Sequence, residues 1–199
     1  MADTTGYFLL QGDALPDDAI AEGFRAHEKI SEPYAVTVQF QTRDRGFDVY
    51  ACLRTQMTLI VVDGDGDKRV FDGVVDEAAF VDVVAEVLHF RVRLRPALAS
   101  LAHRFNSRIF QEKSVVQVIQ AIFEDAGFGD KVEWLNSESY PPREFIVQYR
   151  ESDLNFVSRL MEEYGMFYFF SHTADGHQMY VTDDPTKVAS RDDTPETHF

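Results

Sequence analysis

The side chains best suited to chemistry in this sequence are carboxylates that occur in short clusters. Asp63, Asp65 and Asp67 alternate with other residues as at the start of a calcium-binding loop, where oxygen ligands recur at every second position. Such a loop also needs glycine at its sixth position and glutamate at its twelfth, and this chain has Lys68 and Val74 there. The segment therefore predicts the turn of a β-hairpin and not a calcium site.

Adjacent carboxylates would offer a second chemistry, general acid and base catalysis. Catalytic carboxylates usually converge from different elements, whereas neighbours on one helix point about 100° apart. The adjacent pairs are therefore interpreted as solvated charges; they are Glu162-Glu163, Asp183-Asp184 and Asp192-Asp193.

Two histidines and the only cysteine are the remaining candidates. His172 and His177 flank a predicted turn, so they could approach each other across a hairpin and hold a metal with a third ligand. No third ligand stands at a supporting spacing, and isolated surface histidines are far commoner than metal ligands. Cys52 could pair with a distant histidine as a nucleophile, but nothing in Ala51-Cys52-Leu53 separates it from a small core residue.

Sequence motifs of familiar active sites are missing. There is no Gly-x-Ser-x-Gly elbow, no Gly-x-x-x-x-Gly-Lys phosphate loop and no His-Glu-x-x-His zinc helix. We therefore expect no catalytic residues, no cofactor-binding residues and no metal site, and we interpret the chain as a non-enzymatic protein.

Composition narrows the classes of partner. The 199 residues carry a formal net charge of −15, which would repel a nucleic-acid backbone or an anionic membrane over most of the surface. A single cysteine allows no disulfide within the chain and fits assembly in a reducing cytoplasm. The N-terminal sequence lacks the pattern of a signal peptide, and no 18-residue apolar run occurs. We expect neither nucleic-acid binding nor membrane insertion.

The first hundred residues have the patterns of β-strands. Apolar residues alternate with polar ones from Val36 to Phe40, and residues 57–62 form a β-rich run before the acidic turn. From Leu88 to Leu94 the alternation buries one face and places a basic row of His89 and three arginines on the other. Several strands with few helical signals predict a small barrel or a curled sheet over residues 1–104.

Helical signals enter in the second half. Ser114 and Gln117 form a capping-box pattern, followed by an apolar stripe that ends at Gly127. The run Tyr140-Pro141-Pro142-Arg143 leads stiffly into a strand at residues 145–149, and a turn at 174–176 joins two more strands. We predict a compact α+β domain over residues 105–182. Residues 183–199 have no apolar periodicity and are expected to form an acidic tail or linker.

The clearest helix lies at residues 152–165. Ser152 is placed to cap its N-terminus, and Asp153 lies favourably against the positive end of the helix dipole. The polar residues Asn155, Arg159 and Glu163 recur every four positions, and Gly165 stands where a left-handed C-terminal cap is wanted. This spacing predicts a helix of about three turns with one apolar face.

An aromatic strand follows this helix at residues 166–170. Alternation sends Met166, Tyr168 and Phe170 to one side and Phe167 and Phe169 to the other, so both faces are apolar. A strand covered on both sides is predicted. Either it is a central strand inside one domain, or one of its faces packs against a neighbouring subunit.

Taken in order, these segments resemble the N-terminal, phage-tail-hub-like region of the VgrG family, the spike proteins of type VI secretion systems. The resemblance covers residues 7–183. It is most specific in the run Gln148 to Gly165, and it includes the elements Glu28 to Tyr34, Gly73 to Val75, Leu94-Arg95-Pro96, Arg108 to Gln111 and Tyr140 to Phe145. The signature residues of that run, to which the resemblance gives a structural role, are Gln148, Tyr149, Glu151, Ser152, Asp153, Phe156, Arg159, Leu160, Met161, Glu162, Glu163 and Gly165.

The resemblance implies a fold and a mechanical function. The fold would be α+β and rich in strands, with a phage tail hub-like β-barrel domain followed by a compact α+β domain. The function would be that of a structural hub that caps the tube of a contractile injection machine, sits in its baseplate and helps to deliver effectors.

The implied partners are further copies of the chain in a homotrimer, the tube protein, baseplate proteins, and an effector or adaptor. Assembly would be cytoplasmic, with export by the machine without a signal peptide. Family members continue beyond the equivalent of Phe199, so the chain is expected to be a fragment or a truncated hub. A phage tail hub and a free-standing binding module for an effector or a glycan are the alternatives.

Overall fold

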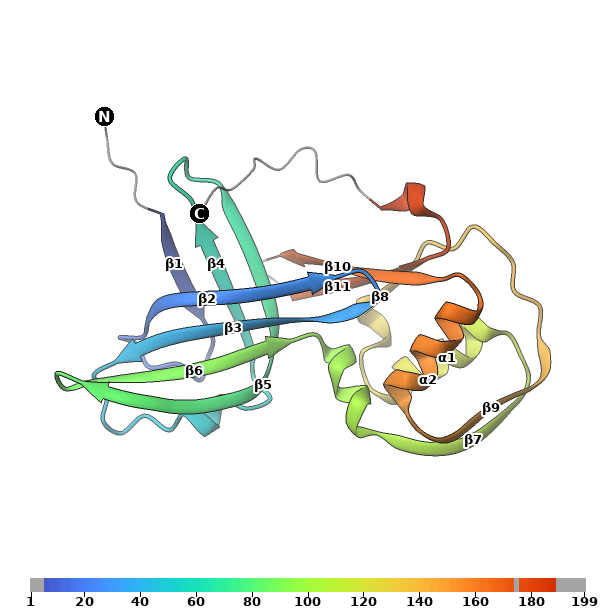
Figure 1. Cartoon of the computed structure of the whole chain (residues 1–199), viewed down its shortest axis with the longest axis horizontal. Helices are drawn as coiled ribbons and strands as arrows, with labels where there is room; N and C mark the ends of the chain where they lie inside the picture. The colour runs from blue at the N-terminus through green and yellow to red at the C-terminus, as the bar shows by residue number, and fades with distance from the viewer. Residues whose placement is uncertain (1–5, 174–175, 189–199) are drawn as a thin grey trace.

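Six antiparallel strands form the first lobe of the computed structural model, which describes residues 6–173 and 176–188. Their order in the sheet is β1-β4-β5-β6-β3-β2, and the sheet curls into a half-barrel (Figure 1). A short 3-10 helix, η1 (Val49–Cys52), follows β3. The strands are β1 (Tyr7–Gln11), β2 (Ile20–Lys29), β3 (Glu32–Thr42), β4 (Gln56–Val62), β5 (Lys68–Val84) and β6 (Val87–Arg95).

The alternation predicted for β6 is confirmed. Phe90, Val92 and Leu94 are buried, while Arg91 and Arg93 lie on the other face. The basic row meets carboxylates of β5, where Arg93 lies within 3.0 Å of both Asp76 and Glu77. Because these pairs are partly exposed, each contributes little to stability.

The acidic segment between β4 and β5 is a hairpin turn, as predicted. The Asp63 carboxylate accepts hydrogen bonds from the backbone N–H groups of Asp65 and Asp67, at 3.0 and 2.9 Å. The strands on either side pair in register from Gln56–Val74 to Val62–Lys68. The aspartate at the start of the segment therefore satisfies backbone donors of the turn.

The second lobe mixes helices with two small sheets (Figure 1). Strand β11 lies between β10 and β8, and strands β7 and β9 form a separate two-stranded antiparallel sheet. The elements are η2 (Ala97–His103), β7 (Phe105–Lys113), α1 (Val115–Asp125), η3 (Gly129–Lys131), β8 (Val132–Trp134), β9 (Arg143–Ser152), α2 (Asp153–Glu163), β10 (Phe167–Thr173), β11 (Gly176–Thr182) and η4 (Pro185–Lys187).

The predicted caps of both helices are confirmed. Ser114 and Gln117 form a reciprocal capping box at the start of α1. The Ser152 hydroxyl accepts a hydrogen bond from Asn155 N–H at 3.2 Å, so α2 begins where its cap was expected. Gly165 has a φ of +69°, the left-handed conformation that a helix C-terminal cap requires.

Replacing Gly165 with valine should lower the free energy of unfolding by about 1 to 3 kcal/mol, because a β-branched residue is strained at positive φ. A Cβ atom at this position would meet nothing within 4 Å, so the cost comes from the backbone conformation and not from a clash. Urea denaturation followed by circular dichroism measures it. Gly165→Asn is the matched control, since asparagine tolerates this region better. Equal stability of the valine variant and the wild type would contradict the cap.

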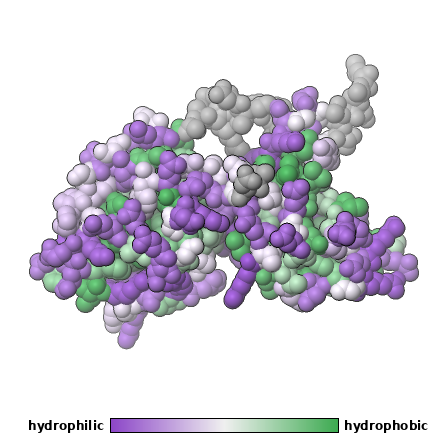
Figure 2. Space-filling view, turned by 180° about the vertical axis from the view of Figure 1, so that it is seen from behind, coloured by the Kyte–Doolittle hydropathy of each residue, from purple (hydrophilic) through white to green (hydrophobic). Residues whose placement is uncertain are grey.

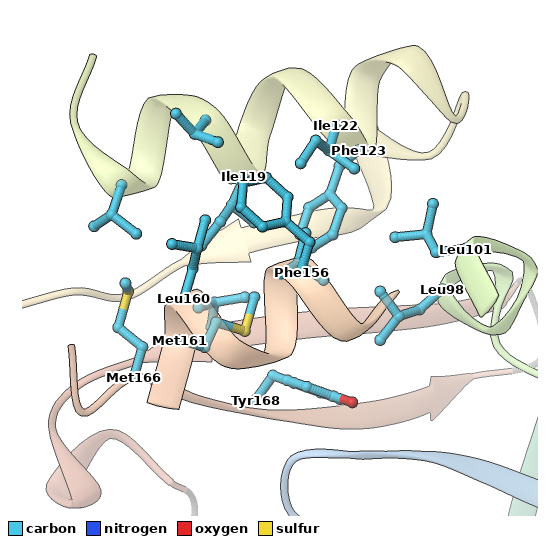
Figure 3. Packing of buried hydrophobic residues seen from close by; sticks show 14 of the residues in the cluster. Leu98, Leu101, Ile119, Ile122, Phe123, Phe156, Leu160, Met161, Met166 and Tyr168 are labelled. Atoms are coloured by element: carbon cyan, nitrogen blue, oxygen red, sulfur yellow. The ribbon is translucent and has the colours of Figure 1, made fainter. Parts of the chain in front are cut away.

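Each lobe has its own hydrophobic core. The half-barrel core is centred on Tyr34, Phe40 and Phe71, and the second core joins α1 and α2 to η2 and the β10–β11 sheet. Figure 3 shows side chains of the two helices pointing toward one another in this second core. Leu98 and Leu101 also belong to the second core, although they precede residue 105. The division at residues 104 and 105 stays a prediction.

The aromatic strand differs from the expectation of a central strand. β10 is at the edge of its sheet, because β11 separates it from β8. Met166 and Tyr168 are buried, whereas Phe167 and Phe169 are half-buried, with Phe169 stacked on Tyr180 of β11 at 5.2 Å. The Tyr168 carbonyl accepts a hydrogen bond from Ser31 N–H of the half-barrel, which joins this edge to the first lobe.

The start of the expected tail is structured. The Asp183 carboxylate, interpreted above as solvated, accepts hydrogen bonds from the N–H groups of Ser137 and Glu138 and from the Tyr140 hydroxyl. Asp184 caps η4. Residues 189–199, with Asp192 and Asp193, and the predicted turn residues Ala174 and Asp175 lie outside the described residues.

Candidate functional site

The side chains of the two histidines suggested as metal ligands are buried where the lobes meet, and not on the surface. They face each other in the register of β10 and β11, as the sequence suggested. His177 Nδ1 lies 2.8 Å from Oδ1 of Asp72 on β5, and its Nε2 accepts a hydrogen bond from Ala97 N–H at 3.3 Å. Since Nε2 is an acceptor, the proton of this ring is on Nδ1, which donates to Asp72.

Asp72 is the centre of this buried network. Its second carboxylate oxygen accepts from Gln56 Nε2 at 2.9 Å and from the Thr58 hydroxyl at 3.1 Å. Burial alone would raise the pKa of Asp72, but the hydrogen bonds from His177 and Gln56 outweigh it and hold the pKa below its ordinary value. The Asp72 N–H donates to His172 Nδ1 at 3.2 Å. These contacts fasten the β10–β11 hairpin to the half-barrel.

The geometry of these groups is not that of a metal or nucleophile site. Among the residues that the structure describes, no three His, Cys, Asp or Glu side chains are grouped so that they could hold a metal ion. Cys52 is buried, and burial raises the pKa of its thiol to about 11, which disfavours the thiolate that a nucleophile needs. No helix within residues 6–173 and 176–188 is long and apolar enough to cross a membrane.

The signature residues are grouped around a second buried carboxylate, that of Asp153 at the start of α2. Its Oδ1 accepts hydrogen bonds from Gln148 at 2.8 Å, Asn106 at 3.0 Å and Arg108 at 2.5 Å. Arg104 Nε lies 3.1 Å from Oδ2. One carboxylate thus connects α2 to both strands of the β7–β9 sheet and to the end of η2.

The charge of Asp153 is stabilised by these contacts. Burial opposes ionisation, but the hydrogen bonds from Gln148 and Asn106 and the nearby Arg108 hold the pKa of this carboxyl below its usual value. Sequence reasoning placed Asp153 against the helix dipole only. It missed the arginines, because they lie on segments 45 or more residues away and no local pattern joins them to Asp153.

The other signature residues divide between core and surface. Phe156, Leu160 and Met161 are buried in the second core. Tyr149 and Glu162 are exposed. On the polar side of α2, Arg159 pairs with Glu151 at 2.7 Å, and Glu163 pairs with Arg143 of β9 at 2.8 Å. The arrangement provides positioning and support, with no group poised for proton transfer or nucleophilic attack.

What these residues support is an exposed apolar surface on the β7–β9 sheet, which we call the ribbon face. Its five large apolar side chains are between 48% and 70% exposed; they are Phe105, Ile109, Phe145, Val147 and Tyr149. The opposite face of the same strands is buried at Ile146 and Gln148. Seen from behind in Figure 2, the surface is mainly hydrophilic, with hydrophobic areas on both lobes.

The ribbon face was not identified from the sequence. Phe145, Val147 and Tyr149 recur at every second position of β9, a spacing of large apolar residues that normally indicates a buried face. In the structure Gln148 points inward instead, because the buried Asp153 accepts its hydrogen bond. A two-stranded sheet has unpaired edges as well as this apolar face, and exposed apolar patches of this kind mark interaction sites.

Two known proteins are similar in sequence to this chain over most of its length. The chain is 36% identical over 182 residues to the type VI secretion system spike protein VgrG4b of Pseudomonas aeruginosa, covering 90% of this chain and 22% of that protein. It is 28% identical over 190 residues to the actin cross-linking toxin VgrG1 of Vibrio cholerae, covering 88% of this chain and 17% of that protein.

A solved structure shares the fold. It is an Escherichia coli component of the type VI secretion system with structural similarity to the T4 bacteriophage tail proteins gp27 and gp5. The TM-score is 0.81 at 25% sequence identity, over 92% of this chain and 51% of that one. The expected strand-rich α+β fold of a phage tail hub is thus confirmed, and its first sheet, expected to be a small barrel or a curled sheet, is a half-barrel.

The chain spans about a fifth of the length of the curated relatives named above. A sequence model of the phage tail baseplate hub (GPD) matches residues 27–199, which include most of both lobes. The chain therefore belongs to the phage tail baseplate hub family.

Proposed function

We propose that this chain forms the N-terminal hub part of a VgrG-like spike, a structural component that caps the tube of a type VI secretion machine. The observation that carries the proposal is the match of the hub family to residues 27–199, together with 36% identity to a type VI spike protein. The proposal includes no catalytic role for the chain. It is supported by the buried carboxylates of Asp72 and Asp153, each of which accepts several hydrogen bonds from side chains of the same chain.

The partners follow from the same proposal. The hub would contact further copies of itself in a homotrimer, the tube protein, baseplate proteins, and an effector or adaptor. It would assemble in the cytoplasm and leave the cell through the machine. The ribbon face supports this, since an assembly part needs an apolar surface that the fold itself leaves uncovered.

A chimera tests the function. Residues 7–188 of this chain would replace the matching region of Pseudomonas aeruginosa VgrG4b, in a strain that has no other spike protein. We expect the tube protein and the chimera to appear in the culture medium, as for the unmodified spike. The control is a chimera with Ile109→Asp on the ribbon face, which should be stable in the cell but exported several-fold less. A wild-type chimera that accumulates without any export would contradict the proposal.

The second candidate, a hub of a phage tail particle, is favoured by the family itself, which is described as a phage tail baseplate hub. The two candidates differ in the particle that contains the native protein. Mass spectrometry of purified contractile particles from the parent bacterium separates them. If the native protein co-purifies with tails that carry a capsid, the phage-hub function is supported and the secretion-hub function is rejected.

A further inference from the structure

A small pocket opens on the second lobe between the end of α1 and strand β8. It has a volume of about 190 Å³, and the residues that line it are Gln120, Phe123, Glu124, Gly129, Val132 and Trp134. Its walls therefore come from α1, η3 and β8. The volume is below the roughly 300 to 1,000 Å³ of pockets that enclose drug-sized ligands, so the pocket suits a single side chain.

One wall of the pocket is aromatic. Trp134 is half-buried, and its ring centroid lies 6.3 Å from that of Phe123, with the ring planes inclined by 33°. Phe123 is fully buried, and Figure 3 shows its side chain directed from α1 into the second core. Aromatic rings carry negative charge density on their faces, which attracts cations.

The polar side chains of the pocket have no partner within the chain. In the part of the chain that the structure describes, the Glu124 carboxylate forms no ion pair, and neither it nor the Gln120 amide forms a hydrogen bond. Lys131, the nearest cation in the sequence, forms no ion pair with Glu124 either. The adjacent carboxylate differs, because Asp125 pairs with Arg104. Glu124 is thus a carboxylate whose charge the fold leaves uncompensated.

The position of Glu124 at the end of α1 favours a bound cation. The C-terminal end of a helix carries a partial negative charge, so cations are stabilised there and carboxylates are not. α1 ends with Glu124 and Asp125 and has no basic residue in its last turn. Departures of this kind from local rules are expected at functional sites. A cation from outside the chain would compensate the charge of Glu124.

Gly129 keeps the pocket open beside this carboxylate. A Cβ atom at position 129 would lie 3.0 Å from Cγ of Glu124 and 3.4 Å from its Cα. The φ angle of Gly129 is outside the left-handed region, so the backbone conformation does not call for glycine here. The close approach to Glu124 does, because a larger residue would displace the Glu124 side chain.

Among cationic groups, a guanidinium fits these features best. It is planar, stacks on aromatic faces and donates two parallel hydrogen bonds to one carboxylate. Its remaining N–H groups can donate to the Gln120 amide oxygen. A lysine ammonium is more strongly hydrated and has no planar face to stack. The formal net charge of −15 also attracts a basic partner to this chain.

We propose that this pocket binds the guanidinium of an arginine side chain presented by a partner protein. The guanidinium would lie against Trp134 and donate hydrogen bonds to the Glu124 carboxylate and the Gln120 amide oxygen. The proposal goes beyond the proposed function and does not depend on it, since it rests on the lining of the pocket alone.

Fluorescence titration of the 199-residue chain tests the site, because Trp134 is the only tryptophan in the sequence. The probe is N-acetyl-arginine amide. Its matched control is N-acetyl-citrulline amide, which has a similar shape and no charge. We expect a saturable change in Trp134 fluorescence with a dissociation constant on the order of 1 mM for the arginine probe, and at least about tenfold weaker binding of the citrulline probe.

Two variants that each remove one negative charge separate the pocket from the overall charge. Glu124→Gln should bind the arginine probe at least about tenfold more weakly. It should not lower the melting temperature, because a carboxylate at a helix C-terminus is unfavourable. Glu133→Gln changes an exposed residue of β8 that does not line the pocket, and it should bind the probe as the wild type does.

Several results would overturn the proposal. They are the absence of a saturable change up to about 50 mM arginine probe, equal affinity for the citrulline probe, and equal affinity of Glu124→Gln. Tighter binding of free L-arginine than of the blocked probe would also overturn it, since the pocket would then take a small metabolite and not a protein side chain. The titration uses the isolated chain, so its result is independent of the export of the chimera.

Discussion

Replacement of Asp72 by alanine is expected to lower the free energy of unfolding at neutral pH by about 3 to 5 kcal/mol, because it removes the buried carboxylate that accepts hydrogen bonds from three donors, each worth about 1 to 3 kcal/mol when left unpaired. The Asp72 side chain is fully buried and accepts hydrogen bonds from His177, Gln56 and Thr58. Without it those three donors are left in the interior unpaired. Urea denaturation monitored by circular dichroism gives the value. Asp65→Ala, at an exposed position of the hairpin turn, is the matched control and should change stability by less than about 0.5 kcal/mol.

The pH dependence of this loss has a defined sign. The pKa of Asp72 is lowered in the folded protein, so the carboxylate contributes stability above its unfolded pKa of about 3.9. That contribution is lost as the pH falls through the folded pKa. The difference in stability between the wild type and Asp72→Asn should therefore shrink as the pH falls below about 4. A difference that grew below that pH would mean that Asp72 is not the stabilising charge.

Replacement of Phe156 by alanine is expected to cost about 3 to 5 kcal/mol, through the lost transfer free energy and the cavity left behind. Phe156 is a fully buried signature residue of α2 that stacks on Phe110 of β7 at 6.0 Å between ring centroids. Figure 3 shows its side chain among those of Ile119 and Phe123 from α1. For a domain whose total stability is about 5 to 15 kcal/mol, this loss is a large fraction.

The matched control for Phe156 is the same change at Phe105, which is 70% exposed on the ribbon face. Phe105→Ala should leave the free energy of unfolding of the monomer within about 0.5 kcal/mol of wild type, because no cavity forms. The two midpoints in urea are measured side by side at low protein concentration. Similar losses for the two variants would mean that the ribbon face is buried in solution even in the monomer.

Much of the secondary structure was predictable because its signals act over short distances. Ser114 and Ser152 cap the helices that follow them, and the alternation in β6 selects the face that is buried. These effects involve neighbours within four residues along the chain. Signals of this range cannot give the position of a strand within its sheet, which explains why residues 166–170 were expected to form a central strand. A strand with two apolar faces can also lie at a sheet edge with one face half-covered, as β10 does.

The sites were less predictable, because each joins residues that are distant in the sequence. His177 and Asp72 are 105 positions apart, so the histidine pair could not be recognised as buried from its own segment. Arg108 and Asp153 are 45 positions apart. The buried Asp153 also accepts a hydrogen bond from Gln148, which therefore points inward, and the next residue, Tyr149, is left exposed.

By itself, then, the amino-acid sequence determined several of the strands, both capped helices and the hub family to which the chain belongs. Only the tertiary structure decided which polar groups are buried together at Asp72 and Asp153, and which apolar residues remain outside on the ribbon face. The physical reason is that backbone conformation follows from local sterics and capping. Burial of a side chain depends instead on what the rest of the chain packs against it.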